Sequence, residues 1–228
     1  MGIAYNTSIV RDGLILYLDA ANLKSYSGTG TAWKDISSNG NDLTLVNTPT
    51  FSSSNNGTFS FDGVSDYATT GNLGYSSHTI SGWINSSMSS AGTGADVSVI
   101  LGNYAGPQES KYTFIGIEGS GIDWRIDNGV ASFALIKKSA FNTNQWYHVA
   151  LTYNSSTGLA VAYLDGEIVG TRSSTTGIVF DSVPFNVAYQ TQDHYFQGSV
   201  SNVQVYNRAL SAEEMSQNFE AMRGRYGV

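Results

Sequence analysis

Cysteine is absent from this chain of 228 residues, which excludes disulfide bonds, cysteine-ligated zinc and catalysis by a thiol. Basic residues are also few, with 11 Lys and Arg against 18 Asp and Glu, so the formal net charge is -7. Nucleic-acid binding normally requires a basic face that releases counterions from the phosphates. We therefore expect no nucleic-acid partner.

Charged residues of both signs make up only 13% of the chain, about half of the usual ~25%. Serine, threonine, asparagine and glycine take their place, and this composition is typical of many strands joined by turns. Long apolar segments are lacking too, since no run reaches the ~18 residues that cross a membrane and none follows a basic start. We expect neither membrane insertion nor a secretory signal.

Apolar residues alternate with polar ones, or form short continuous runs, over most of the chain, and both patterns predict strands. The clearest hairpin pairs residues 146–153 with residues 159–164 through a loop of about five residues. Every second residue from Tyr147 to Tyr153 is apolar and shares one face of the first strand. A meander is predicted at 97–101, 112–117, 122–126 and 131–136, and further strands at 14–18, 42–46, 59–61, 78–84, 178–180, 185–189 and 197–206.

One helix is predicted near the C-terminus, at about residues 211–223. Ser211 and Glu214 form a capping box, and an apolar stripe follows with the i, i+4 and i+7 spacing of a helix. Gly224 is expected to end it. Residues 1–12 are interpreted as an N-terminal arm, and residues 13–228 as one domain that includes the helix.

Five short motifs, each present once, follow one another along the chain. They are LILYLD at 14–19, WKDISSNGN at 33–41, FSFDG at 59–63, WYHVALTY at 146–153 and VQVYNRALS at 203–211. As a set they resemble the laminin-G-like branch of the concanavalin A-like lectins, from about residue 13 to the end. The resemblance implies an all-β fold, in which two antiparallel sheets pack as a jelly-roll sandwich with one C-terminal α-helix.

Both ends of the chain resemble tailed-bacteriophage structural proteins that carry this domain. The similar segments are residues 5–14, 207–214, 217–219 and 224–227. The resemblance implies a virion protein that is assembled in the host cytoplasm and exposed on the particle surface. Its partners would be other virion proteins and sister subunits of a homo-oligomer. The chain departs from many relatives at Ser201 and Asn202, where they carry an Asp-Glu pair.

Oxygen-bearing side chains near the first strand suggest a calcium site, because calcium prefers carboxylate, amide and carbonyl oxygens. The candidate ligands are Asp19, Asp35 and Asn39. The alternative is that Asp35 and Asn39 shape turns by bonding to nearby backbone groups. Both interpretations stay open, and the two charges missing at Ser201 and Asn202 weigh against calcium.

Sugar binding requires an exposed aromatic ring beside amide and carboxylate groups. Several loops and strand ends combine these groups, and core positions are the alternative for Tyr112 and Trp124. The other three tryptophans, at 33, 83 and 146, are expected in the core. The candidate glycan-binding residues are Tyr104, Tyr112, Trp124, Arg125, Asp127, Gln192, His194 and Tyr195.

The leading hypothesis is a non-enzymatic virion surface protein, either a capsid decoration or a fibre or tail adhesin, that binds host-surface glycans weakly. Many copies would add their weak sites through effective concentration. A cementing protein without a ligand is the first alternative, since a fold does not dictate a function. The second is a polysaccharide-acting enzyme. It is disfavoured because no Glu-x-Asp-x-x-Glu strand is present, and Glu118 and Asp123 are the acids to mutate in its test.

Overall fold

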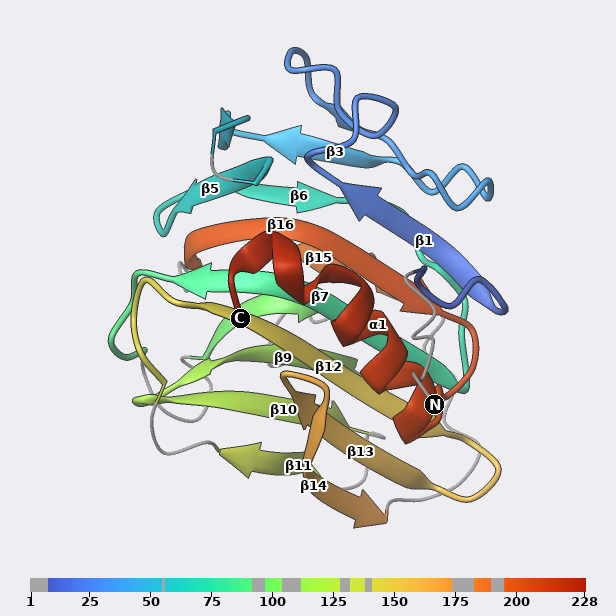
Figure 1. Cartoon of the computed structure of the whole chain (residues 1–228). Helices are drawn as coiled ribbons and strands as arrows, with labels where there is room; N and C mark the ends of the chain where they lie inside the picture. The colour runs from blue at the N-terminus through green and yellow to red at the C-terminus, as the bar shows by residue number, and fades with distance from the viewer. Residues whose placement is uncertain are drawn as a thin grey trace, which may run out of the picture.

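Two antiparallel sheets packed face to face form the body of the computed structural model (Figure 1). The structure describes residues 8–54, 56–91, 97–103, 112–127, 132–137, 141–173, 183–189 and 195–228, with the backbone alone for 127 and 132–137. Within these ranges a single helix follows the last strand. The predicted jelly-roll sandwich is therefore confirmed.

The first sheet contains the predicted hairpin. Its strand order is β14 (Glu167–Ser173), β13 (Leu159–Leu164), β12 (Trp146–Asn154), β7 (His78–Ser86), β16 (Gln197–Tyr206), β5 (Thr58–Asp62) and β4 (Thr50–Ser52). The strand β1 (Leu14–Asp19) joins this sheet by pairing with the second half of β16.

The second sheet contains the predicted meander, whose four strands lie side by side in chain order. The predicted strand at 178–180 falls outside the described residues. The strand order is β11 (Ser132–Lys137), β10 (Gly121–Asp127), β9 (Tyr112–Glu118), β8 (Ser98–Gly102), β15 (Asn186–Val187), β6 (Tyr67–Thr69), β3 (Leu43–Val46) and β2 (Ala32–Trp33).

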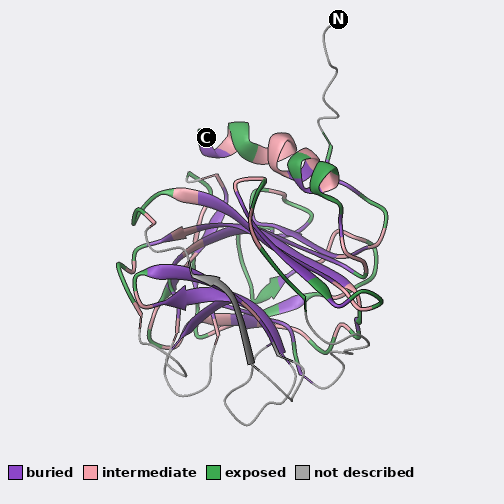
Figure 2. Cartoon of the chain, turned by 90° about the horizontal axis from the view of Figure 1, so that it is seen from below, coloured by how far each residue is buried: buried purple, intermediate pink, exposed green. Residues whose placement is uncertain are grey.

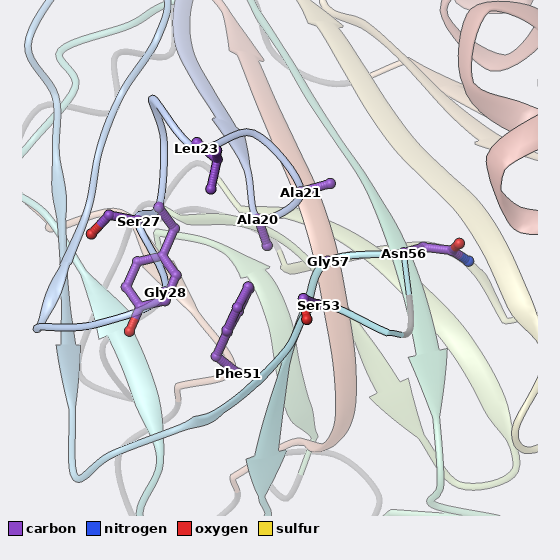
Figure 3. Close-up of a pocket in the computed structure, with 10 residues that line it drawn as sticks. Ala20, Ala21, Leu23, Ser27, Gly28, Phe51, Ser53, Asn56 and Gly57 are labelled. Atoms are coloured by element: carbon purple, nitrogen blue, oxygen red, sulfur yellow. The ribbon is translucent and has the colours of Figure 1, made fainter.

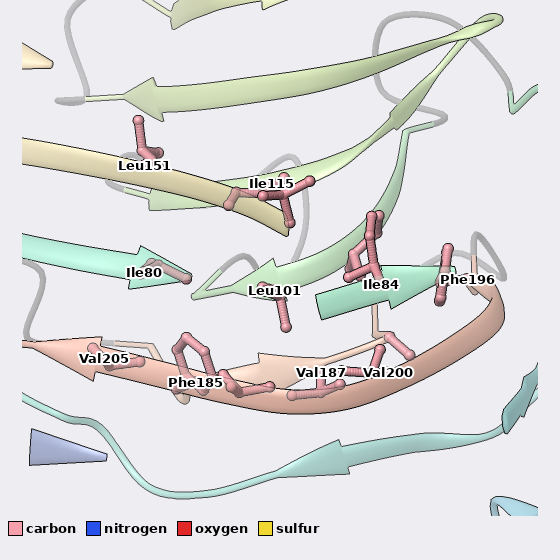
Figure 4. Close-up of a cluster of buried hydrophobic side chains, with 14 of the residues drawn as sticks. Ile80, Ile84, Leu101, Ile115, Leu151, Phe185, Val187, Phe196, Val200 and Val205 are labelled. Atoms are coloured by element: carbon pink, nitrogen blue, oxygen red, sulfur yellow. The ribbon is translucent and has the colours of Figure 1, made fainter. Parts of the chain in front are cut away.

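Apolar side chains that alternate along the strands fill the space between the sheets (Figure 4). Most strand residues of the two sheets are buried (Figure 2). Leu151 of β12 and Val205 of β16 meet Leu101 and Ile115 of the second sheet in this core, and none of the four is exposed. Burying one side chain of this size stabilises a fold by about 1.5–3 kcal/mol. The period of two along each strand therefore determines which residues face inward.

The helix α1 (Ala212–Tyr226) lies across the outer face of the first sheet, in front of β16, β7 and β12 (Figure 1). The predicted capping box of Ser211 and Glu214 is present. The predicted end at Gly224 is wrong, because Gly227 adopts the left-handed conformation at φ 74° and donates its N–H to the Arg223 carbonyl. No helix in the described ranges has the length and apolar character needed to cross a membrane.

Residues 8–12 of the predicted arm pack against this helix, and residues 1–7 lie outside the described ranges. The Val10 N–H donates to Asn218 Oδ1 at 2.8 Å, and the Ser8 carbonyl accepts from Gln217 at 2.8 Å. Tyr206 of β16 donates its hydroxyl to the Val10 carbonyl at 3.0 Å. These bonds tie the arm, the helix and the sheet together.

Two histidines are buried in different layers. His78 lies between the sheets and is fully buried, whereas His148 lies on the outer face of the first sheet, 1% exposed, beneath Phe219 of the helix. Burial lowers the pKa of each from 6.5 to about 4, because removal from water disfavours the charged imidazolium. As the pH falls from 6.5 towards 4, these histidines are protonated in the unfolded chain but remain neutral in the folded chain. The free energy of unfolding therefore decreases.

Replacing His148 with phenylalanine is expected to remove half of this acid sensitivity. Between pH 7 and pH 5, the free energy of unfolding of His148→Phe should rise by about 2 kcal/mol relative to the parent chain. Urea denaturation of both proteins at the two pH values measures this difference. A difference that does not change with pH would contradict the proposed burial of a neutral imidazole.

Candidate functional site

A groove of about 400 Å³, here called the polar groove, opens on the outer face of the first sheet beside the C-terminal end of α1. Its lining is uncharged and rich in amides and hydroxyls, and it contains one indole ring. The lining residues are Ser54, Asn56, Asn85, Asn144, Trp146 and Ser199.

Strand register brings three of these side chains into one row. Asn85 of β7 is paired with Trp146 of β12 on one side and with Ser199 of β16 on the other. Their chain neighbours Tyr147 and Val200 belong to the core, so the row itself faces outward. Trp146 is half-buried, which corrects its predicted core position.

Three amide side chains at the groove retain their full hydrogen-bonding capacity. Within the described ranges, the side chains of Asn56, Asn85 and Asn144 neither donate nor accept a hydrogen bond. Each primary amide supplies two donors and one acceptor oxygen. Together with the indole face of Trp146, they form a surface that suits a polyhydroxylated, neutral ligand.

The end of the helix holds Trp146 in place. The Tyr226 ring lies 4.9 Å from the Trp146 ring, and it stacks on Trp83 at 4.0 Å with 13° between the planes. The Tyr226 hydroxyl donates to Ser201 Oγ at 2.8 Å and accepts from the Asn202 amide at 2.9 Å. Ser201 and Asn202 thus anchor the end of the helix to the sheet.

Arg225 holds the other wall of the groove. Its guanidinium donates to the Asn56 carbonyl, to Ser201 Oγ at 2.9 Å and to Asp19 Oδ1 at 2.8 Å. Asn56 and Gly57 adopt left-handed backbone conformations, with φ of 62° and 60°. A Cβ at Gly57 would lie 2.3 Å from the Ala21 backbone, so only glycine fits there.

The residues predicted to bind calcium use their oxygens within the protein. Asp19 accepts from Arg225 and from the Ala21 N–H at 3.0 Å. Asp35 accepts from the N–H groups of Tyr17, Ser37 and Asn41 and from the Ser37 hydroxyl.

The Asn39 amide in turn donates to the Leu14 carbonyl at 3.1 Å. No group of three acidic or histidine side chains with metal-binding geometry exists in the described part of the chain. In this structure these oxygens shape turns and pair with a guanidinium.

Two aromatic rings of the predicted glycan site are buried. Trp124 is fully buried and Tyr112 is 7% exposed, so neither offers a ring face to solvent. Asp127 ends β10, but its side chain lies outside the described ranges, as do Tyr104, Gln192 and His194.

Tyr195, another predicted site residue, is half-buried in a cluster of tyrosines. Its ring lies 6.0 Å from Tyr189 and 6.4 Å from Tyr67 of β6. Ala68, the next residue along β6, points into the core, so Tyr67 is on the outer face of the second sheet. Tyr195 therefore belongs to a different layer from the polar groove.

Arg125, also a predicted site residue, bridges two buried acids on neighbouring strands. Its guanidinium contacts Asp123 at 2.7 Å and Glu118 at 2.6 Å. Burial, followed by the neighbouring Glu118 carboxyl, raises the pKa of Asp123 from 3.8 to about 7. The folded chain therefore keeps this proton at pH values where the unfolded chain has lost it.

The raised pKa gives a stability that is present below pH 4 and is lost as the pH rises through 7. Replacing Asp123 with asparagine removes this dependence. The free energy of unfolding of the variant is expected to rise relative to that of the parent chain as the pH increases from 4 to 7. Parallel urea titrations of both proteins across this window test it, and parallel stability curves would contradict it.

Comparisons with known proteins agree with this architecture. A family model described as the concanavalin A-like lectin/glucanases superfamily, of laminin G type, matches residues 61–216. No curated protein sequence matches the chain significantly.

Among solved structures, domain 4 of an extracellular arabinanase from Geobacillus stearothermophilus, in complex with arabinotriose, is similar at a TM-score of 0.67 and 15% identity. The match covers 90% of this chain and 97% of that domain. Trypanosoma rangeli sialidase in complex with sialic acid matches at a TM-score of 0.67 and 18% identity, over 93% of this chain and 33% of the enzyme.

The receptor-binding domain of botulinum neurotoxin type G matches at a TM-score of 0.69 and 15% identity, over 92% of this chain and 51% of that one. The chain thus spans about a third of the sialidase and half of the toxin domain. At these identities the likeness establishes the fold alone.

Proposed function

The chain belongs to the concanavalin A-like lectin/glucanases superfamily, and from that premise we propose that it is a non-enzymatic carbohydrate-binding domain whose site is the polar groove. One observation carries the proposal: a half-buried indole lies beside three amide side chains that have no partner in the described part of the chain. Binding of arabinotriose by the similar arabinanase domain supports it at the level of the fold.

The groove would bind a sugar through two kinds of contact. The apolar C–H face of a pyranose or furanose ring packs on the Trp146 indole, which buries apolar area at little cost in entropy because Tyr226 already fixes the ring. The Asn85 and Asn144 amides exchange hydrogen bonds with the sugar hydroxyls. The Trp146 ring is therefore held in position before the sugar binds.

The acid geometry supports binding without hydrolysis. Glycoside hydrolysis places two carboxyl groups about 5–10 Å apart across one sugar. Glu118 and Asp123 are instead buried, and both contact one arginine. Among the described residues, no carboxylate lines the polar groove. We therefore propose that the protein is not an enzyme.

We place the protein on the surface of a tailed-phage particle, as a capsid decoration or an adhesin, because both ends of its sequence resemble phage structural proteins. A shallow groove with one aromatic ring supports weak binding, which becomes useful when many copies act together. Virion proteins would be its partners. A cementing protein without a ligand remains the alternative if no sugar binds.

The test is binding of the protein, displayed multivalently on beads, to an array of neutral and acidic glycans, with and without a chelator. Binding that survives chelation is expected, since the oxygens of Asp19 and Asp35 are engaged by protein donors. Loss of binding with chelator would overturn the calcium-free site. If no glycan on the array binds, carbohydrate binding is overturned and the cementing role is favoured.

A further inference from the structure

A second cavity, here called the apolar pocket, adjoins the polar groove. It has a volume of about 410 Å³ and is mostly apolar (Figure 3). Leu23 is 81% exposed at its rim, and Phe51 of β4 is half-buried. The lining residues are Ala20, Ala21, Leu23, Tyr26, Ser27, Gly28, Phe51, Ser53, Asn56 and Gly57.

The aromatic wall of this pocket is rigid. Tyr26 packs edge-on against Phe51 at 4.9 Å and against Phe59 at 4.7 Å. The Tyr26 hydroxyl donates to the Gly30 carbonyl at 3.0 Å, which satisfies the polar end of the ring. The pocket therefore presents apolar surface and requires no rearrangement before a ligand enters.

The turn after β4 connects the two cavities. Ser53 lines the apolar pocket, Ser54 lines the polar groove, and Asn56 lines both. Arg225 donates to the Asn56 carbonyl, and Gly57 packs closely against the Ala21 backbone, so the Asn56 end of this turn is held in place. One extended ligand that crosses the turn would fill both.

The lack of charge in the cavity lining favours a neutral ligand. None of the described residues that line either cavity is charged. The guanidinium of Arg225, beneath the turn, is already paired with Asp19. With a net charge of -7, the protein as a whole repels anions. An acidic sugar, such as a uronic or sialic acid, would find no partner for its carboxylate here.

We infer that the two cavities form one site for a neutral oligosaccharide, in which the apolar pocket takes a sugar unit that bears a methyl-containing substituent, either a 6-deoxy carbon or an acetyl group. The inference rests on the proposed function and adds specificity to it. The polar groove holds the hydroxyl-rich unit, while Leu23 and Phe51 remove the substituent of the neighbouring unit from water.

Matched pairs of neutral oligosaccharides, with and without one acetyl or 6-deoxy group, test this inference on the multivalent protein. We expect the substituted member to bind about fourfold or more tightly, because each buried CH₂-sized group contributes about 0.8 kcal/mol. Leu23→Ser should lower this preference to less than twofold. Val64→Ser, at another apolar residue that is 70% exposed, is the control and should keep both the preference and the binding of the plain member as in the parent chain.

Each outcome separates this inference from the proposed function. Equal binding of both members by the parent chain, with Trp146 still required, overturns the apolar subsite and leaves the polar groove intact. A preference that Leu23→Ser does not reduce places the substituent elsewhere and also overturns it. Preferential binding of acidic glycans contradicts the charge argument. Failure of every glycan to bind overturns both proposals.

Discussion

Trp146→Ala is expected to weaken binding of the best-bound glycan at least about thirtyfold, which corresponds to about 2 kcal/mol. The reason is that the indole is the only aromatic ring among the described residues that line the polar groove. Without the indole, the face of a sugar ring has no apolar surface to pack on. Surface-immobilised glycan binding by monovalent protein, measured as a dissociation constant, checks the expectation without the amplification of multivalent display.

Two comparison variants make this result specific. Trp146→Phe keeps an aromatic face and should retain most of the affinity. Tyr195→Ala removes a half-buried aromatic ring from the tyrosine cluster and should leave binding unchanged. Because Trp146 contacts Tyr226, the melting temperature of each variant must be compared with that of the parent chain.

The opposite pattern would refute the assignment. If Tyr195→Ala removes binding and Trp146→Ala does not, the sugar site lies in the tyrosine cluster, near where the sequence predicts it. If Trp146→Ala binds as the parent does, the polar groove has no role in recognition. If Trp146→Ala does not fold, the glycan affinities of Trp146→Phe and Asn85→Ala decide whether the polar groove binds the sugar.

The position of Trp124 was already contained in the strand pattern. Ile122, Trp124 and Ile126 alternate with Asp123 and Arg125 along β10, so the tryptophan shares the inward face with the isoleucines. Taken alone, the two charged neighbours favour exposure of Trp124. In a strand, however, their side chains point to the face opposite that of Trp124. Periodicity thus outweighs the polarity of adjacent residues.

The position of Trp146 depended on contacts that are distant in sequence. Alternation along β12 puts Trp146 on the outer face, opposite Tyr147. Part of that face lies under α1, and the ring contact of Trp146 with Tyr226 is made where the helix ends. The helix ends at Gly227 and not at Gly224, and no local pattern distinguishes the two glycines. The strands and the capping box were predictable, whereas the groove required the tertiary structure.

The second large effect is expected at Arg225. Arg225→Ala should lower the free energy of unfolding by about 3 kcal/mol, because Asp19 is left as a buried carboxylate without its charged partner. The Asn56 carbonyl loses its guanidinium donor at the same time, so the turn between the two cavities is released. Urea denaturation and glycan binding of the same variant measure both consequences.

Arg223→Ala is the matched control, two residues earlier on the helix. Arg223 forms an ion pair with Glu220 at 2.7 Å in which its side chain is 46% exposed, and such surface pairs contribute about 0–1 kcal/mol. Arg225→Lys keeps the charge but not the planar fork that reaches Asp19, Ser201 and Asn56 together, so it should recover only part of the loss. Equal stabilities of Arg225→Ala and Arg223→Ala would contradict this role. If Arg225→Ala loses stability but keeps the sugar affinity of the parent chain, Arg225 only anchors the helix. The turn then keeps its shape without the guanidinium.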